Sequence, residues 1–241
     1  MRVEVSSARA RTNATAGVYG AKLRAWFPLV LFAFALAAYL WRRGAQWQWP
    51  ELAWFAAATL QMMIRWPHVE RNRGNLTVEQ RVSLGDQWAM LAVFLSLLCI
   101  PVCYLATPWL DAWDYPLADG WSVLGALMML VSLWVFHRSH VELGRNWSPS
   151  LEIRQGHSLV TQGIYARVRH PMYASIWLFA LAQPLLLHNW VAGALAIPGF
   201  GILYFLRVRA EEALMRETFG EAYEAYMRRT GRLWPRFRAR S

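Results

Sequence analysis

Acidic residues, lysine and cysteine are scarce in this sequence of 241 residues. The chain has 15 Asp and Glu residues and 25 Lys and Arg residues, which gives a formal net charge of +10. Nearly all of the basic residues are arginines. The two cysteines, Cys99 and Cys103, lie four residues apart in one apolar run, so they share a helix face and have no loop to close. We therefore expect two reduced packing residues and no disulfide framework.

The sequence also lacks the motifs of several enzyme classes. No G-x-G-x-x-G stands between a strand and a helix, which excludes an ordinary dinucleotide-binding domain. His137 and His140 form a single pair, too few to fill the coordination sites of a histidine-rich membrane oxygenase, and we interpret them as interfacial residues at a helix end. Residues 1–24 contain no cleavable apolar signal and predict a flexible basic tail.

Apolar residues make up 56% of the chain and are gathered into long runs. A bilayer-spanning helix requires about 20 mainly apolar residues. Six runs approach this length: 25–41, a weaker run at 50–64, 88–110, 121–136, 171–188 and 189–206. The sequence therefore predicts an all-α, polytopic membrane protein with about six transmembrane helices, the last two forming a hairpin.

The arginines predict the orientation of these helices, because cytoplasmic loops hold an excess of basic residues. The N-terminal tail, the 65–87 and 137–170 loops and the C-terminal segment are Arg-rich, whereas the 106–120 loop has no basic residue and three Asp. Only Arg42 and Arg43 lie on the other side, so we expect both termini in the cytoplasm. Tryptophans near the predicted span ends suit interfacial anchors: Trp26, Trp41, Trp54, Trp88, Trp109, Trp121 and Trp190.

The net positive charge is consistent with two kinds of binding partner, nucleic acid and anionic lipid. The basic residues are spread over several loops and form no patch with interleaved stacking aromatics, so we expect no nucleic-acid partner. Attraction to membrane lipids explains the charge more simply, and the basic segment 228–238 is the expected lipid contact.

The most informative segment is Arg169-His170-Pro171-Met172-Tyr173, where a polar Gly-rich stretch meets the apolar hairpin. Pro171 fits the first turn of a helix, so His170 is expected at the N-terminus of the fifth span, where free N–H groups favour an anionic ligand group. The glycines of the preceding loop make it permissive enough to wrap a ligand. Tyr165 and Tyr173 are then placed to stack on that ligand or bond to it.

A second polar cluster, Arg207 to Glu212, follows the hairpin. Arg207 and Glu211 share a helix face at the end of the sixth span, in the weaker order for a structural ion pair, so we interpret them as ligand-binding residues. Glu212 and Glu224 each have an arginine four residues later in the favourable order. We interpret both as solvated charges on a helix face.

Taken with their neighbours, these motifs resemble the isoprenylcysteine carboxyl methyltransferase family of integral membrane enzymes. That family carries H-x-L-V-T-x-G-x-Y, then R-H-P-x-Y, an apolar hairpin and R-x-x-x-E-E ahead of F-G-x-x-Y-x-x-Y. Here the elements read His157 to Tyr165, Arg169 to Tyr173, Arg207 to Glu212 and Phe219 to Tyr226. The resemblance covers residues 121–235. We expect transmembrane helices over residues 25–120, and a catalytic membrane methyltransferase core with a C-terminal amphipathic helix over residues 121–241.

The resemblance implies S-adenosyl-L-methionine as cofactor and methyl transfer to a lipophilic, isoprenylcysteine-like carboxylate. Arg207 would hold the acceptor. The matching positions imply a cofactor pocket on the cytoplasmic face lined by His157, Ser158, Leu159, Val160, Tyr165, His170, Pro171, Met172, Tyr173 and Glu211. Direct displacement at a sulfonium methyl needs a positioned nucleophile and exclusion of water more than a strong acid or base.

Three alternatives remain open from the sequence. A phospholipid amine or a thiol is a possible acceptor on the same fold, and an amine would need His170 or Glu211 as a base. A sterol-reductase-type membrane enzyme has a similar Arg-His-x-x-Tyr element and binds a nicotinamide cofactor, but Pro171 and the R-x-x-x-E-E element favour the methyltransferase. A non-catalytic membrane interaction protein with a degenerate site is the third. The sequence does not indicate an oligomeric state.

Overall fold

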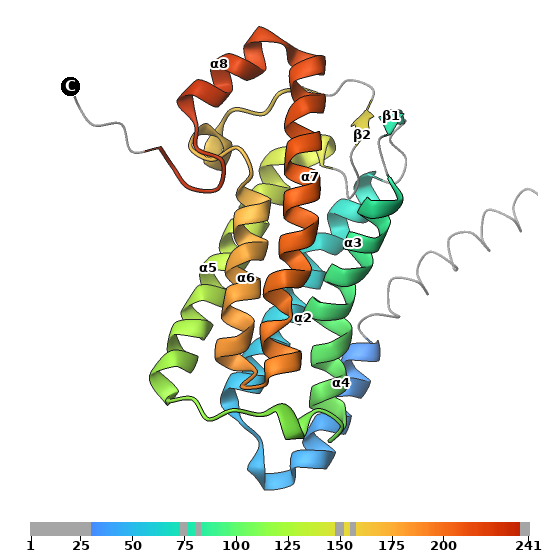
Figure 1. Cartoon of the computed structure of the whole chain (residues 1–241), viewed down its shortest axis with the longest axis vertical. Helices are drawn as coiled ribbons and strands as arrows, with labels where there is room; N and C mark the ends of the chain where they lie inside the picture. The colour runs from blue at the N-terminus through green and yellow to red at the C-terminus, as the bar shows by residue number, and fades with distance from the viewer. Residues whose placement is uncertain (1–29, 73–76, 81–82, 148–151, 155–157, 237–241) are drawn as a thin grey trace, which may run out of the picture.

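A computed structural model describes residues 30–72, 77–80, 83–147, 152–154 and 158–236 (Figure 1). The predicted N-terminal tail of residues 1–24, Trp26 and His157 lie outside the described residues. Within these ranges the chain is almost entirely helical, as the long apolar runs predicted.

The helices follow the predicted order of the apolar runs. Residues 30–43 are helical, and the 3₁₀ turn η1 (Gly44–Gln46) follows them. The main helices are α2 (Trp49–Asn72), α3 (Leu84–Phe94), α4 (Ile100–Ala106), α5 (Asp119–Leu143), α6 (Pro171–Leu186), α7 (Ala196–Phe219) and α8 (Glu221–Arg229). The π-helical segments η2 (Leu95–Cys99) and η6 (Trp190–Ala194) continue α3 into α4 and precede α7, and the remaining short 3₁₀ turns are η3 (Asp111–Trp113), η4 (Gly144–Asn146) and η5 (Gly163–Ala166).

These helices form one elongated bundle (Figure 1). α5 packs against α6 and α2, α7 packs against α3 and α6, and α8 crosses one end of the bundle beside the end of α7. We call this the α8 end. Both α2 and α5 continue beyond their predicted spans, by two turns or so, so the loops that follow them are shorter than the sequence predicted.

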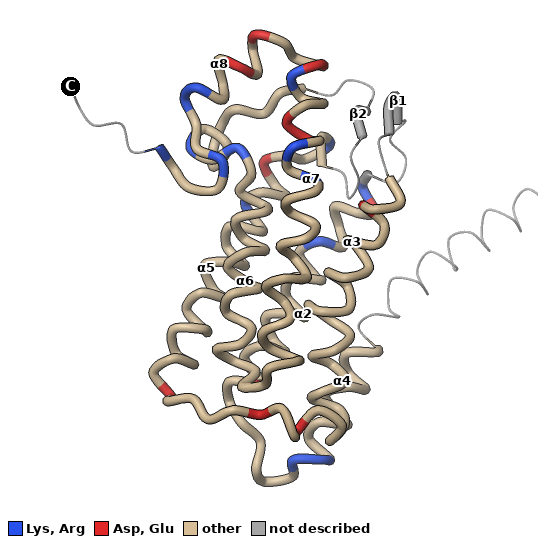
Figure 2. The backbone as a smooth tube through the Cα atoms, viewed as in Figure 1, with Lys and Arg blue, Asp and Glu red and all other residues tan. Residues whose placement is uncertain are grey.

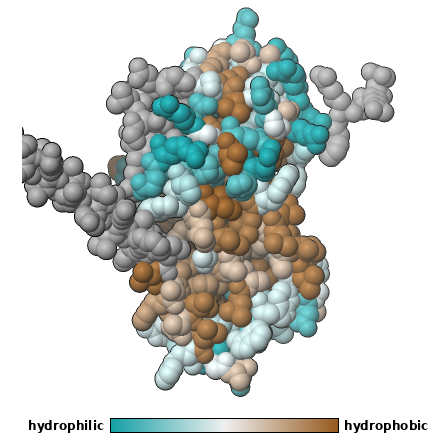
Figure 3. Space-filling model, turned by 180° about the vertical axis from the view of Figure 1, so that it is seen from behind, coloured by the Kyte–Doolittle hydropathy of each residue, from teal (hydrophilic) through white to brown (hydrophobic). Residues whose placement is uncertain are grey.

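Within the described ranges, three helical segments are long and apolar enough to cross a membrane: Leu84–Ala106, Asp119–Asn146 and Trp190–Phe219. α6 is apolar but has only 16 residues. On the face seen in Figure 3, hydrophobic residues cover much of the middle and lower part of the bundle, and hydrophilic residues gather toward the α8 end. A large apolar surface of this kind suits lipid and not water.

The predicted all-α fold is correct for nearly all of the described residues, to which a short two-stranded antiparallel sheet is added. β1 (Thr77–Gln80) pairs with β2 (Glu152–Arg154), with Thr77 opposite Arg154 and Gln80 opposite Glu152. The strands are too short to leave a periodic signal in the sequence. They join the loop after α2 to the loop before α6 at the α8 end (Figure 1).

Charged residues concentrate at the two ends of the bundle and leave its middle nearly free of them (Figure 2). Arg42 and Arg43, the exceptions to the predicted orientation, are both paired with acidic residues. Arg42 Nη1 lies 2.8 Å from Asp111 Oδ2, and Arg43 Nη2 lies 2.7 Å from Glu51 Oε1. Local ion pairs therefore account for their position.

The prediction of interfacial tryptophans is wrong for Trp54, and the other described tryptophans of that set are exposed. Trp41, Trp88, Trp109, Trp121 and Trp190 are exposed, as interfacial anchors should be. Trp54 is fully buried, and its Nε1 donates to Gln183 Oε1 at 3.1 Å. A buried polar acceptor on α6 explains why an indole with an N–H can lie in the core.

Gly199 allows α7 to approach η2 closely. A Cβ at this position would overlap the Oγ of Ser96 and lie 2.8 Å from its Cβ. In the apolar Gly199-Phe200-Gly201 segment, Gly199 therefore permits a close helix approach. A Cβ at Gly201 would meet only Trp177, at an ordinary contact distance of 3.4 Å.

We expect Gly199→Ala to destabilise the bundle and Gly201→Ala to be tolerated. Overpacking costs about 1–3 kcal/mol, whereas alanine in an open helical position gains up to about 1 kcal/mol over glycine. Thermal unfolding in detergent should show a lower midpoint for the first variant only. Equal midpoints for the two variants would contradict the close approach.

Candidate functional site

The start of α6 has the geometry that the Arg169-to-Tyr173 motif predicted. His170 occupies the N-cap position with non-helical backbone angles, and Pro171 is the first helical residue. Proline suits this position because its missing N–H would have no partner in the first turn. The side chain of His170 is thus fixed at the end of a helix, at the α8 end of the bundle.

Glu212 lies buried behind this helix start and accepts hydrogen bonds from three cationic or ionisable side chains. Its Oε1 is 3.2 Å from His170 Nε2 and 3.2 Å from Arg169 Nη2, and its Oε2 is 2.6 Å from Arg232 Nη2. Only 3% of its side chain is exposed. The prediction that Glu212 is a solvated helix-face charge is wrong, while Glu224 is exposed as predicted.

The segment after α8 completes this cluster. Arg169 N donates to Gly231 O at 2.9 Å and His170 N donates to Arg232 O at 3.0 Å. The backbone of this segment therefore runs beside the residues that precede α6. The hydrogen bond to Glu212 raises the pKa of Arg232 above its already high value, so its charge is constant. Arg232 belongs to the segment 228–238 that we expect to contact lipid, of which residues 237 and 238 lie outside the described residues, and it also binds a buried carboxylate.

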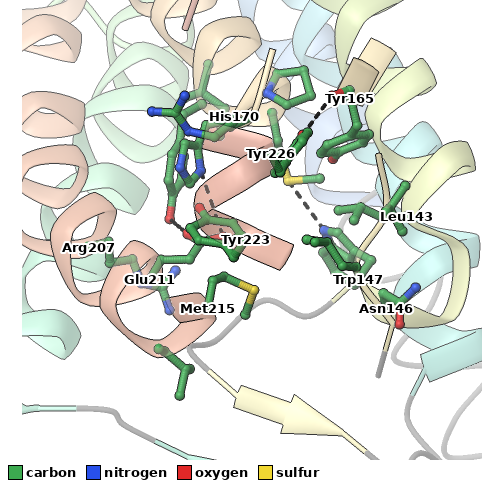
Figure 4. Close-up of a pocket in the computed structure, with 18 of the residues that line it drawn as sticks. Leu143, Asn146, Trp147, Tyr165, His170, Arg207, Glu211, Met215, Tyr223 and Tyr226 are labelled. Atoms are coloured by element: carbon green, nitrogen blue, oxygen red, sulfur yellow. Dashed lines mark hydrogen bonds and ion pairs between the residues drawn. The ribbon is translucent and has the colours of Figure 1, made fainter. Parts of the chain in front are cut away.

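A cavity of about 210 Å³ lies in front of the cluster, between α2, α3, α5, α6, α7 and α8 (Figure 4). All ten described residues of the predicted site line it. They are Ser158, Leu159, Val160, Tyr165, His170, Pro171, Met172, Tyr173, Arg207 and Glu211. Residues that are up to 53 positions apart in the sequence therefore share one pocket.

Glu211 presents a partly solvated carboxylate to this pocket. Its side chain is 34% exposed, in contrast to the buried Glu212 next to it. Tyr173 Oη donates to Glu211 Oε2 at 2.6 Å, and the rings of Tyr173 and His170 stack with centroids 5.5 Å apart. An oriented carboxylate beside aromatic rings is suited to a cationic ligand group.

Arg207 lines the pocket but already has a carboxylate partner. Its Nε donates to Asp86 Oδ1 at 2.7 Å, and both side chains are less than 10% exposed. Asp86 lies in the first turn of α3, so this ion pair joins α3 to α7. The pair fixes the position of Arg207 relative to Glu211, one turn further along α7.

Residues 158–165 form one wall of the pocket, and hydrogen bonds hold this segment at both ends. Asn146 Oδ1 accepts from Ser158 N at 3.0 Å, and Tyr226 Oη donates to Tyr165 O at 2.7 Å. Gly163 has a φ of +59°, and a Cβ there would overlap the carboxylate of Glu142. Burial raises the pKa of Tyr165 well above its usual value, so this phenol stays neutral.

Several pocket residues were not predicted. Tyr223 and Tyr226 lie in a motif that the sequence did identify, and burial raises the pKa of both phenols above their usual value. Arg65, Met90 and Val93 come from α2 and α3, where no motif pointed to the site. The spacing of residues in a single sequence does not indicate that these positions lie near the loop before α6.

The interpretation of His140 as an interfacial residue is wrong. His140 is fully buried, its Nδ1 lies 2.9 Å from Phe136 O, and its ring contacts that of Trp147 at 5.0 Å. α5 continues to Leu143, so His140 lies inside the helix and packs behind the pocket wall; His137 is exposed, as predicted. Among the described residues, no three His, Cys, Asp or Glu form a group that suits a metal ion.

The fold and the pocket define a helical membrane protein with a partly polar cavity enclosed at one end of its bundle. Residues 122–217 match the model of the isoprenylcysteine carboxyl methyltransferase (ICMT) family. This match confirms the predicted resemblance over that segment.

Individual curated proteins are similar to part of the chain. The chain is 35% identical over 91 residues to a protein-S-isoprenylcysteine O-methyltransferase of Schizosaccharomyces pombe, covering 37% of this chain and 39% of that protein. It is 29% identical over 109 residues to the cobalt-zinc-cadmium resistance protein CzcN of Cupriavidus metallidurans, covering 45% and 50%. The matches thus span half or less of the length of these two curated relatives.

A solved structure extends the likeness of fold to nearly the whole chain. The eukaryotic intramembrane Ras methyltransferase ICMT superposes with a TM-score of 0.53 at 15% sequence identity, covering 98% of this chain and 87% of that one. The described helices therefore share the fold of that enzyme.

We expect Glu212→Gln to destabilise the protein strongly. Loss of one partner from a buried ion pair costs about 3–5 kcal/mol, and Arg169, only 6% exposed, would keep an uncompensated charge. Glu224→Gln is the matched control, since an exposed substitution changes stability by about 0.5 kcal/mol or less. Thermal unfolding in detergent compares the two. Similar midpoints would contradict the structural role of Glu212.

Proposed function

We propose that this protein is an S-adenosyl-L-methionine-dependent membrane methyltransferase that methylates the carboxylate of a lipophilic, isoprenylcysteine-like acceptor. The observation that carries this proposal is the convergence of the family's separate motifs on one cavity. Ser158 to Tyr165, His170 to Tyr173, and the Arg207 and Glu211 pair all line it. If the motifs matched by chance, these segments would not be expected to lie together in the folded chain.

The residues of the pocket fit the proposed cofactor. S-adenosyl-L-methionine supplies an electrophilic methyl group on a sulfonium and carries a cationic amino group. Glu211, held by Tyr173 and 34% exposed, offers a carboxylate to such cations. Tyr165 and Trp147 offer aromatic surface on the same cavity. The donor set therefore matches a ligand with both cationic and aromatic parts.

The chain's own residues would act by positioning and by excluding water. A carboxylate acceptor is ionised near neutral pH and needs no base to become a nucleophile. Arg207, fixed by Asp86, would orient the acceptor from α7. Apolar residues on the same cavity, among them Ile176, Leu203 and Leu214, limit the access of water to the reacting groups.

The proposed arrangement in the membrane keeps six spans, with both termini and the pocket on the cytoplasmic side. The basic residues at the α8 end support this orientation, because cytoplasmic ends are Arg-rich. The three long apolar helices supply half of the spans. An acceptor with a lipid tail would then reach the pocket from the bilayer, and the cofactor from the cytoplasm.

We expect purified protein in detergent to bind S-adenosylhomocysteine, and Glu211→Ala to weaken this binding. Loss of one charge-assisted contact costs about 1.5–3 kcal/mol, about 10-fold to 150-fold in affinity. Calorimetric titration measures the affinity, with the exposed Glu221→Ala as the matched control. Binding of NADPH in place of S-adenosylhomocysteine would refute the methyltransferase and favour a reductase.

A further inference from the structure

Arg65 is a cationic residue of the pocket that belongs to none of the family's motifs. It lies on α2, one residue past the apolar run at 50–64, and lines the same cavity as Arg207 and Glu211. Its side chain is half-buried. A cation at this depth is costly unless an opposite charge accompanies it.

Among the described residues Arg65 makes no ion pair. The other two arginines of the cavity both have carboxylate partners: Arg207 Nε lies 2.7 Å from Asp86, and Arg169 Nη2 lies 3.2 Å from Glu212. The described contact of Arg65 is with Trp147, whose ring centroid is 5.3 Å from its guanidinium carbon. An aromatic face attracts a cation but does not neutralise its charge.

Trp147 holds Arg65 in place for a ligand. The indole is buried, its Nε1 donates to Met172 Sδ at 3.4 Å, and the ring of His140 packs 5.0 Å away. It is therefore a fixed surface. A guanidinium over an aromatic face keeps its N–H donors available in its own plane, which suits a planar, bidentate anion such as a carboxylate.

Among the described residues that line the cavity, Arg65 has no carboxylate partner and Glu211 has no arginine partner. Arg207 and Asp86 neutralise each other, and the Glu212 cluster accounts for Arg169. Arg65 therefore remains as a cation, and Glu211 remains as an anion to which Tyr173 donates and whose Oε1 lies 4.0 Å from His170 Nδ1. A pocket with this pair of free charges is complementary to ligands that bring both a cationic group and an anionic one.

We propose that Arg65 binds a carboxylate of a ligand in this pocket. The inference rests on the proposed function, in which two ligands carry this group: the acceptor and the amino-acid end of the cofactor. Glu211 takes the cationic part and Arg65 the anionic part. Arg65 thereby extends the site to α2, outside the segment matched by the family.

Two binding measurements on full-length protein in detergent test this role and distinguish the two carboxylates. The first is calorimetric titration with S-adenosylhomocysteine. The second compares the affinities for N-acetyl-S-farnesylcysteine and for its carboxamide, which lacks the negative charge. The variants are Arg65→Gln and Arg65→Lys, and the control is Arg71→Gln, an exposed arginine in the last turn of α2.

We expect Arg65→Gln to lose at least about 10-fold in affinity in one of the two measurements, because a charge-assisted bond is lost. Arg65→Lys should retain part of it, since it keeps the charge but not the planar fork. A loss with the acceptor acid but not its amide identifies the acceptor's carboxylate. A loss with S-adenosylhomocysteine identifies the cofactor's. Arg71→Gln should bind both ligands like the wild type.

Unchanged affinity of Arg65→Gln for both ligands would overturn the proposal. A second pattern would also overturn it. Arg65→Gln would unfold at a lower temperature without ligand and would lose affinity equally for the acid and the amide, and Arg65→Lys would not restore that affinity. Such a result is expected of a structural residue. Failure of the proposed function looks different: the wild type itself would bind neither S-adenosylhomocysteine nor the farnesylcysteine acid.

Discussion

The buried carboxylate of Glu212 is the constraint on which the arrangement of the site depends. It is held between the start of α6, through Arg169 and His170, and the segment after α8, through Arg232. The buried charges of Glu212 and Arg169 would each be costly without the other, so the elements that carry them stabilise one another. The cluster thus fixes both the floor of the pocket and the path of the chain beyond α8.

This cluster lets two adjacent glutamates on α7 take different tasks. Glu212 is buried and forms structural ion pairs, while Glu211 remains partly solvated beside Tyr173. The same division separates the arginines: Arg169 and Arg207 are paired, whereas Arg65 is held by Trp147. Structural charges are therefore satisfied within the protein, and the charges left over are those that a ligand can meet.

The sequence alone predicted much of the helical order and the convergence of the motifs. Long apolar runs and the His170-Pro171 helix start are local signals, and they need no knowledge of distant partners. The burial of Glu212 was not predictable in this way, because its partners His170 and Arg232 lie 42 and 20 residues away. The favourable spacing to Arg216 suggested a solvated pair, but tertiary contacts outweigh such weak local pairing. Arg65 and the two short strands were missed for the same reason.

The most direct test of the account is transfer of a radiolabelled methyl group. Protein in liposomes would be incubated with S-adenosyl-L-methionine labelled on its methyl group and with N-acetyl-S-farnesylcysteine. The account predicts a labelled product that releases its label as methanol in mild base, since a methyl ester is hydrolysed under these conditions. Label that stays on a base-stable amine or thioether, or no transfer to any lipophilic acceptor, would contradict carboxyl methylation.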